Sequence, residues 1–272
     1  MTVRKALAAG SARLSRCSDT PRLDAELLMA EALETSRQAM LLSRLDDDAP
    51  AAFEALVARR EMAEPVAYIL GKRTFWTVEL EVGPGVLVPR PDSETLIEAA
   101  LEHFGARGPR RILDLGTGPG TLLLAALDQW PEASGVGVDA SEAALSYAAR
   151  NAQRLGLASR AEMRIGDWGE GVEERFDLIL CNPPYVEEGA NLPRDVVAWE
   201  PHEALFAAPD GLAEYRRLAP QIPRLLSPGG IACVEIGAGQ GSAVASLFEA
   251  AGLRVRSRKD LAGMDRCLVL NS

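Results

Sequence analysis

The sequence lacks the features of membrane-spanning, secreted and metal-binding proteins. No stretch approaches the about 18 uncharged apolar residues of a membrane span, and the start of the chain carries charge every few positions where a signal peptide has an apolar core. Histidine is scarce and isolated, and the four cysteines form no C-x-x-C pair. These cysteines are Cys17, Cys181, Cys233 and Cys267. We therefore expect reduced thiols, no bound metal, no membrane association and a cytoplasmic location.

Basic residues are also in the minority. The 272 residues include 29 Lys and Arg against 39 Asp and Glu, a net charge of −10. Residues 1–90 are nearly balanced, so residues 91–272 carry about −9 of this charge. Such an acidic segment is poorly suited to binding a nucleic-acid backbone. The content of 47% hydrophobic and 25% charged residues is typical of a globular protein, and the length predicts one large domain or one with a smaller companion.

Glycine is absent from the stretch between Gly10 and Gly71, where apolar residues recur at three- and four-residue spacings. This spacing is typical of amphipathic helices, so residues 1–72 are predicted to form a small helical bundle. Residues 74–88 then alternate apolar with polar side chains and break at Gly83-Pro84-Gly85, which predicts a β-hairpin. We assign residues 73–91 to this hairpin linker.

Strands and helices alternate in the remaining residues, 92–272. The segments R-I-L-D-L-G, F-D-L-I-L-C and G-I-A-C-V-E-I-G are nearly continuous apolar runs, as expected of strands buried on both faces. Helical patterns separate them, and residues 212–226 are predicted to form one such helix. This alternation predicts a doubly wound α/β domain built on a mostly parallel sheet.

A glycine-rich loop follows the first strand of this domain. Glycines at the start of a helix let a ligand approach the backbone closely, although they also serve as simple strand-to-helix turns. The G-T-G-P-G spacing differs from the G-x-G-x-x-G of pyrophosphate binders and fits a nucleoside without a pyrophosphate, which indicates S-adenosylmethionine. The predicted loop residues are Gly116, Thr117, Gly118, Pro119 and Gly120.

Two further residues at strand ends complete the predicted cofactor site. Asp139 ends the next strand, where doubly wound folds place a carboxylate that accepts hydrogen bonds from ribose hydroxyls. The alternative is that Asp139 caps the helix that begins near Ser141. Trp168 follows the third strand and offers a ring that can flank adenine, with an exposed loop aromatic as the alternative.

The fourth strand ends in Asn182-Pro183-Pro184-Tyr185, at the sheet edge where open α/β folds bind ligands. An amide or aromatic amine nitrogen is a poor nucleophile because its lone pair is delocalised. If the Asn182 side-chain oxygen and the Pro183 carbonyl accept both N–H bonds, that lone pair is directed at the methyl group. Tyr185 is predicted to pack against the flat substrate group. We therefore predict catalytic roles for Asn182, Pro183 and Tyr185 and substrate binding by all four residues.

In the order of its motifs the sequence resembles the HemK/PrmC family, the protein-(glutamine-N5) methyltransferases that modify peptide chain release factors. The resemblance covers nearly the whole chain. The segments that carry it are E-P-V-A-Y-I-L-G at 64–71, F-W at 75–76, P-R-P-D-S-E at 89–94, L-D-L-G-T-G at 113–118, N-P-P-Y at 182–185, E-P-x-x-A-L at 200–205, D-G-L at 210–212 and D-L-A-G-x-D-R at 260–266.

The resemblance implies a class I methyltransferase domain with a seven-stranded sheet whose last strand is antiparallel. It also implies that the helical domain helps to recognise a protein substrate. The cofactor would be S-adenosylmethionine, bound at Gly116 to Gly120, Asp139, Trp168 and Asn182. The acceptor would be the glutamine of the Gly-Gly-Gln loop of class 1 release factors, and methylation would modulate translation termination.

One residue departs from the pattern of the family. Pro119 stands where the family usually has threonine or serine, so the loop lacks a hydroxyl and an N–H there.

Three other functions compete with release factor methylation. A ribosomal protein is an alternative glutamine substrate. An exocyclic amine of a flipped nucleic-acid base also fits the Asn-Pro-Pro-Tyr chemistry, but the acidic charge disfavours it. A non-catalytic binding module is a further alternative, against which the intact loop and Asn182 argue.

Overall fold

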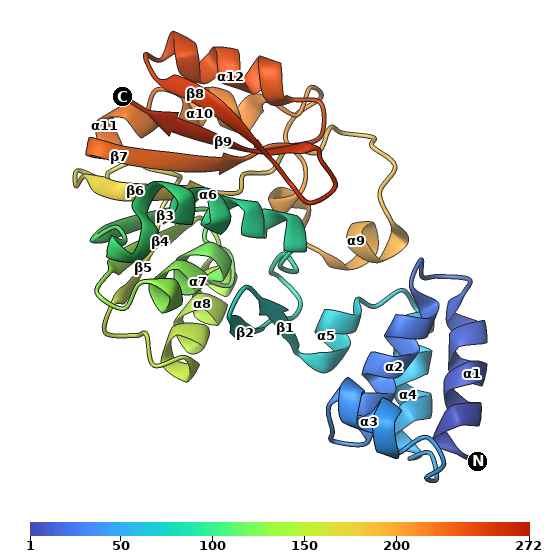
Figure 1. Ribbon diagram of the computed structural model, residues 1–272. Coiled ribbons are helices and arrows are strands. Elements are labelled where there is room, and N and C mark those ends of the chain that lie inside the picture. Colours follow the sequence, from blue (N-terminus) through green and yellow to red (C-terminus); the bar gives the residue numbers. More distant parts are fainter. The chain divides into compact units, whose positions relative to one another are not determined.

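The computed structural model describes residues 1–272, which form two compact units. The first unit consists of residues 1–72 together with residues 191–200, and the second contains residues 73–190 and 201–272. The sequence predicted neither the return of residues 191–200 to the first unit nor the grouping of the hairpin with the second. The chain therefore passes from one unit to the other three times (Figure 1).

The first unit is a bundle of short helices, as the apolar spacing predicted. Pro21 occupies the first turn of α2, where its missing N–H has no partner to lose, and Ser36 caps α3 by accepting from the Ala39 N–H. Its core includes Leu7, Leu28 and other fully buried apolar side chains. The helices are α1 (Val3–Leu14), α2 (Pro21–Ala32), α3 (Arg37–Ser43), α4 (Ala52–Glu61), α5 (Val66–Leu70) and α9 (Arg194–Trp199).

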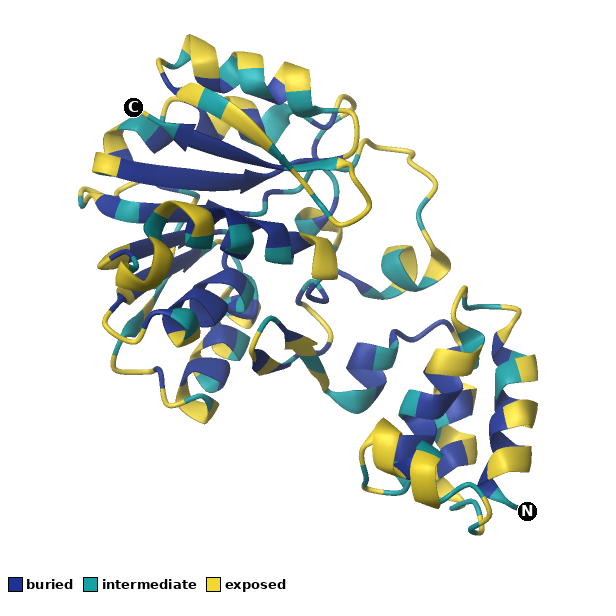
Figure 2. Ribbon diagram, in the orientation of Figure 1, coloured by how far each residue is buried: buried dark blue, intermediate teal, exposed yellow.

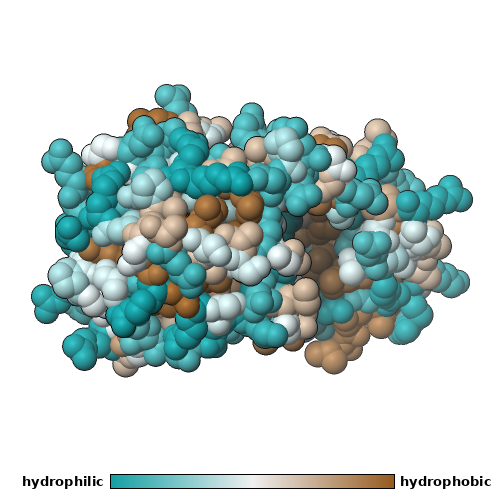
Figure 3. Space-filling model, turned by 90° about the horizontal axis from the view of Figure 1, so that it is seen from above, coloured by the Kyte–Doolittle hydropathy of each residue, from teal (hydrophilic) through white to brown (hydrophobic).

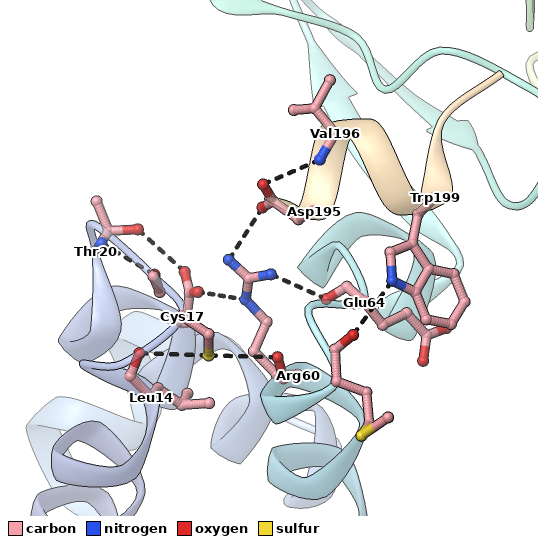
Figure 4. A network of polar contacts seen from close by, with 11 residues as sticks. Leu14, Cys17, Thr20, Arg60, Glu64, Asp195, Val196 and Trp199 are labelled. Carbon is pink, nitrogen blue, oxygen red and sulfur yellow. Dashed lines mark hydrogen bonds and ion pairs between the residues drawn. The ribbon is translucent and has the colours of Figure 1, made fainter. Parts of the chain in front are cut away.

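A buried arginine joins the segment that carries α9 to the rest of this unit (Figure 4). The side chain of Arg60 is only 6% exposed; its Nε donates to Asp24 at 2.8 Å and its NH2 group to Asp195 at 3.1 Å. The remaining guanidinium nitrogen donates to the main-chain oxygen of Glu64 at 3.2 Å. One cation thus satisfies acceptors from three parts of the chain that are far apart in sequence.

The second unit contains a seven-stranded sheet in the order β5-β4-β3-β6-β7-β9-β8. All neighbouring strands are parallel except that β9 runs antiparallel to β7 and β8, as the family resemblance implied. The doubly wound fold predicted from the sequence is confirmed. The strands are β3 (Arg111–Leu115), β4 (Ser134–Asp139), β5 (Ala161–Ile165), β6 (Phe176–Cys181), β7 (Leu226–Glu235), β8 (Arg254–Lys259) and β9 (Asp265–Asn271).

Helices cover both faces of this sheet, and its central strands are buried (Figures 1 and 2). Alternate strand residues such as Leu113, Val136 and Ile179 pack with Tyr215 and Phe248 in one core cluster beneath α10 to α12. The intervening residues face the layer of α6, α7 and α8. The helices are α6 (Glu94–Phe104), α7 (Thr121–Gln129), α8 (Glu142–Arg154), α10 (Ala213–Leu218), α11 (Ile222–Leu225) and α12 (Gly241–Ala250), with single 3-10 turns at Pro91–Ser93, Gly105–Arg107 and His202–Ala204.

Two sequence-based predictions were wrong in detail. The hairpin consists of β1 (Lys72–Phe75) and β2 (Val78–Glu81) and turns at Trp76, whose φ is +53°, not at Gly83-Pro84-Gly85. Gly83 instead allows close approach, because a Cβ there would lie 2.5 Å from the Tyr147 hydroxyl. The helix expected over 212–226 is divided into α10 and α11, which Pro220 and Pro223 explain, since proline disrupts a helix interior.

No helix combines the length and the apolar composition needed to cross a bilayer. On the face seen in Figure 3, hydrophilic side chains predominate and hydrophobic ones are scattered among them. The four cysteines are free thiols, three of them buried.

Candidate active site

A cavity of about 640 Å³ opens at the carboxyl ends of the parallel strands of the second unit. The loops that follow β3, β4, β5 and β6 all contribute to its wall, together with residues that precede α6 and residues at the start of α10. This is the sheet edge at which doubly wound folds bind ligands, and the volume is that of a small-molecule site. The strand ends singled out in the sequence therefore meet around one space.

The glycine loop forms one side of this cavity. Gly116, Thr117, Gly118 and Pro119 line it, and Gly116 and Gly118 have φ values of +74° and +57°, which favour glycine. Gly120 does not line the cavity, contrary to its predicted role. A Cβ at Gly120 would lie 2.7 Å from a Leu124 methyl group, so this glycine allows the loop to pack on α7.

A buried asparagine anchors the glycine loop at the main-chain carbonyl of Pro119. Asn151 on α8 donates through Nδ2 to the Pro119 carbonyl at 2.9 Å and to the Glu81 carbonyl at 3.0 Å, and its Oδ1 accepts from the Glu81 N–H at 2.7 Å. The carbonyl of the loop is therefore held without the side chain that the family usually has here. The same amide anchors β2 to the loop.

Asp139 supports the glycine loop directly. Its Oδ2 accepts from the Gly118 N–H at 2.8 Å and its Oδ1 from the Ser141 N–H at 2.9 Å. The alternative in which Asp139 caps the following helix is wrong, because Ser141 is the cap and accepts from the Ala144 N–H at 3.2 Å. Asp139 lines the cavity, and a carboxylate has further lone pairs with which to accept ribose hydroxyls.

The Asp139→Ala variant is expected to bind S-adenosylmethionine about 1.5–3 kcal/mol more weakly, the range for a charge-assisted hydrogen bond. The loss of the Gly118 contact adds to this effect by loosening the loop. Titration calorimetry measures the affinity, and Ser141→Ala, which removes the helix cap beside it, is the control. Equal affinities of Asp139→Ala and the wild type would contradict the assignment.

A second carboxylate, Asp114, was not predicted as a site residue. It lies in β3 beneath the glycine loop and lines the cavity although it is only 1% exposed. Its Oδ2 accepts from the Thr117 hydroxyl at 2.7 Å and the Leu123 N–H at 3.1 Å, whereas Oδ1 has no partner. Burial raises the pKa of Asp114 to about 7 despite these hydrogen bonds. A charged residue within the apolar strand R-I-L-D-L-G was the signal that could have identified it.

The raised pKa of Asp114 predicts a pH dependence of stability. Between the ordinary pKa of 3.8 and about 7, the folded protein keeps the Asp114 proton that the unfolded chain has lost, so rising pH favours unfolding. Asp114→Asn removes this titration while preserving the shape. The wild type is therefore expected to lose stability relative to Asp114→Asn as pH rises from 4 to 7, as measured by urea unfolding without cofactor. Parallel pH profiles for the two proteins would contradict the raised pKa.

Trp168 lies against the glycine loop and is not an exposed loop aromatic. A Cβ added to Gly116 would lie 3.0 Å from the Trp168 ring, and the indole Nε1 donates to Glu214 on α10 at 2.7 Å. The ring packs partly on the core and lines the cavity. Its position therefore allows the predicted contact with an adenine ring.

The Asn182-to-Tyr185 turn forms the wall beside the glycine loop. Asn182 and Pro184 line the cavity, while Pro183 is buried and the Tyr185 hydroxyl donates to Glu235 Oε1 at 3.2 Å. Neither Pro183 nor Tyr185 is among the cavity-lining residues, so their contact with a substrate stays a prediction. Asn182 Nδ2 donates to a buried partner, and its Oδ1 therefore remains available as an acceptor.

These residues fit S-adenosylmethionine. The orphaned Asp114 oxygen offers an acceptor to a cationic ligand group, Gly118 has no atom within 4 Å of a would-be Cβ, and Trp168 supplies an aromatic face. Acidic side chains outnumber basic ones around the cavity, which suits a positively charged sulfonium compound. The charged lining residues are Arg90, Asp114, Asp139, Asp167, Glu203, Glu214 and Arg217.

Two family models match the chain. One, described as Methyltransferase domain, matches residues 109–236, and the other, described as PrmC N-terminal domain, matches residues 5–71. A protein named release factor glutamine methyltransferase from Rhodospirillum rubrum is 46% identical over 259 residues, covering 92% of this chain and 79% of its own length. The protein of the same name from Cereibacter sphaeroides is 46% identical over 274 residues, covering 98% and 97%.

Solved structures share the fold at lower identity. A methyltransferase from Pyrococcus furiosus has a TM-score of 0.52 at 20% identity and covers 80% of this chain and 96% of its own. A 16S rRNA N2 G1207 methyltransferase from T. thermophilus, in complex with AdoMet and guanosine, has a TM-score of 0.52 at 23% identity, covering 74% and 49%. At these identities the likeness concerns the fold alone.

Proposed function

The chain belongs to the release factor glutamine methyltransferase family, and from this membership we propose that it methylates the side-chain amide nitrogen of a release factor glutamine. The methyl donor is S-adenosylmethionine, which when bound supplies an electrophilic methyl group on a positively charged sulfur. The observation that carries the proposal is that Asn182 and the glycine loop line the same cavity.

The residues of the Asn182-to-Tyr185 turn compensate for the weak nucleophilicity of an amide nitrogen. Asn182 Oδ1 and the Pro183 carbonyl accept the two N–H bonds of the glutamine amide and fix its orientation. Asp139 and Trp168 bind the nucleoside part of the cofactor, and Asp114 accepts from a cationic part of it. Because the acceptors and the cofactor loop are fixed by the same sheet edge, the nitrogen and the methyl group are brought together in one orientation.

We assign the acceptor glutamine to the Gly-Gly-Gln loop of class 1 release factors, and we propose a cytoplasmic location for the activity. The family membership and the acidic charge of residues 91–272 support a protein substrate over a nucleic acid. The first unit adds a second surface for a folded partner, which raises the effective concentration of the loop at the cavity. A folded release factor should therefore be a better substrate than a short peptide.

Mass spectrometry tests the proposal. Purified chain and S-adenosylmethionine are incubated with a release factor, with the same factor lacking the loop glutamine, with ribosomal proteins and with DNA or RNA. The expected result is one methyl group on the tryptic fragment that carries the loop glutamine and none on the glutamine-free factor. Methylated nucleic acid or ribosomal protein together with an unmodified release factor would refute the proposal.

A further inference from the structure

A buried carboxylate lies directly behind the wall of the cavity. Glu235 ends β7, is only 1% exposed and does not line the cavity. Its Oε2 has no hydrogen-bond partner. Burial raises the pKa of Glu235 to about 7, although hydrogen bonds from Ser93 and Tyr185 lower it. An incompletely satisfied carboxyl group is unfavourable in a core, so its contacts call for a functional explanation.

Glu235 contacts both ends of the Asn182-to-Tyr185 turn. The Tyr185 hydroxyl donates to Glu235 Oε1 at 3.2 Å. At the other end Ser93 lies between Glu235 and Asn182: its hydroxyl is near enough to the carboxyl group to lower the Glu235 pKa, and Asn182 Nδ2 donates to Ser93 Oγ at 3.2 Å. Ser93 is 2% exposed, which limits the water that could replace these partners. One carboxyl group therefore reaches both ends of the turn, directly at Tyr185 and by way of Ser93 at Asn182.

The direction of these hydrogen bonds decides what Asn182 presents to the cavity. A serine hydroxyl has a single hydrogen. When that hydrogen is donated to Glu235, only the Ser93 lone pairs face Asn182, so Nδ2 turns toward Ser93 and Oδ1 toward the cavity. If Ser93 donated to Asn182 instead, the amide would flip and its NH2 group would face the cavity. An NH2 group cannot accept an N–H bond from a substrate amide.

We propose that Glu235 is a positioning residue for methyl transfer: by accepting from Ser93 and Tyr185 it holds the Asn182 amide with Oδ1 toward the substrate. The proposal rests on the proposed function for the identity of the substrate. The orientation of Asn182, however, is a property of the protein alone and can be tested without a substrate.

The other groups near Glu235 do not change charge near neutral pH. Arg266 from β9 lies close enough to lower the Glu235 pKa, and Asp92, which precedes α6, raises it; the two form an ion pair at 3.2 Å. The thiols of Cys181 and Cys267 stay neutral because burial raises their pKa. Protonation of Glu235 itself is therefore the event that weakens the acceptor, and it occurs as pH falls through about 7.

The first test follows the side-chain amide resonances of Asn182 by NMR in the full-length protein, identified by their loss in Asn182→Asp. In the wild type they are expected to shift with a midpoint near pH 7, and in Glu235→Gln and Ser93→Ala this shift should disappear. Resonances that do not move in the wild type, or that move equally in Glu235→Gln, would overturn the proposal. Asp114 also has a pKa of about 7 and lines the same cavity, so the titration is repeated in Asp114→Asn. A shift that persists in Asp114→Asn supports Glu235 even if Glu235→Gln fails to fold, and a shift that is lost in Asp114→Asn would overturn the proposal.

The second test is kinetic. Glu235→Gln and Ser93→Ala are expected to lower methyl transfer to a release factor by roughly 10- to 100-fold, as for a misplaced reacting group, with S-adenosylmethionine affinity nearly unchanged. Tyr215→Phe is the matched control, because its hydroxyl donates to the main-chain oxygen of Glu235 at 3.0 Å and not to the carboxyl group. This control should lose stability but keep the Asn182 shift and the transfer rate.

The outcomes separate the two proposals. Wild-type activity on the release factor with an equally active Glu235→Gln would refute the positioning role and leave the proposed function intact. Absence of wild-type activity on any release factor would refute the proposed function, and the NMR titration would still decide the role of Glu235.

Discussion

The Asn182→Ala variant is expected to methylate a release factor at least about 100-fold more slowly than the wild type while binding S-adenosylmethionine nearly as well. Asn182 lines the cavity and donates through Nδ2 to the buried Ser93 Oγ, which leaves Oδ1 as the side-chain acceptor for a substrate amide. Its acceptor is needed most where the amide nitrogen attacks, so the loss should appear in kcat more than in cofactor affinity. Single-turnover kinetics and calorimetry measure the two quantities separately.

Asn182→Asp provides the sharper comparison. It retains an acceptor oxygen but replaces the NH2 group that donates to Ser93 with a second oxygen, and it adds charge beside the cofactor. A near-normal rate in Asn182→Asp would show that only the acceptor is required. A near-normal rate in Asn182→Ala would remove this residue from the mechanism.

Replacing Arg60 by methionine is expected to destabilise the first unit by about 3–5 kcal/mol, because it leaves buried acceptors without their cation. Asp24 is 5% exposed and would lose its ion pair, and the main-chain oxygen of Glu64 would lose a donor. Hydrogen exchange detected by mass spectrometry is the suitable measurement, since the second unit serves as an internal reference. Faster exchange is expected in α2, α4 and residues 191–200.

Two further variants define the origin of this effect. Arg60→Met combined with Asp24→Leu is expected to recover much of the stability, because both buried charges are then removed. Asp195→Ala should have a smaller effect, confined to residues 191–200, because its side chain is one-quarter exposed. Unchanged exchange in α2 and α4 after Arg60→Met would show that the buried pair contributes nothing to stability.

The parts of the fold that local sequence patterns specify could be predicted. Apolar strands, helical spacing and the glycine loop each depend on neighbouring residues, and the structure confirms the doubly wound sheet they indicated. The contact between Arg60 and Asp195 joins residues 135 positions apart, and no local pattern encodes it. The hairpin turn was misplaced because Gly83 has a packing role and Trp76 adopts the positive φ that glycine usually supplies.

The residues of the candidate site divide in the same way, into those that a local sequence pattern predicted and those that only the structure identifies. Asn182 and Asp139 were predicted because each directly follows or ends an apolar strand, at the edge where such folds bind ligands. Asp114 and Glu235 are each a single carboxylate in an apolar strand, a signal that marks both residues as unusual but does not say that each keeps an oxygen without a hydrogen-bond partner. Their importance follows from burial and unpaired oxygens, which only the three-dimensional arrangement reveals.

The discontinuity of the first unit has a consequence for synthesis on the ribosome. Residues 191–200 leave the ribosome about 120 to 130 residues after Lys72, and at roughly 5–20 residues per second this delay lasts on the order of 10 s. Throughout this interval Asp195 is missing from its place beside Arg60, while the first strands of the second unit are already emerging. A nascent chain stalled before residue 190 therefore carries an unfinished helical bundle, and the two units reach their final form in overlapping periods, not one after the other.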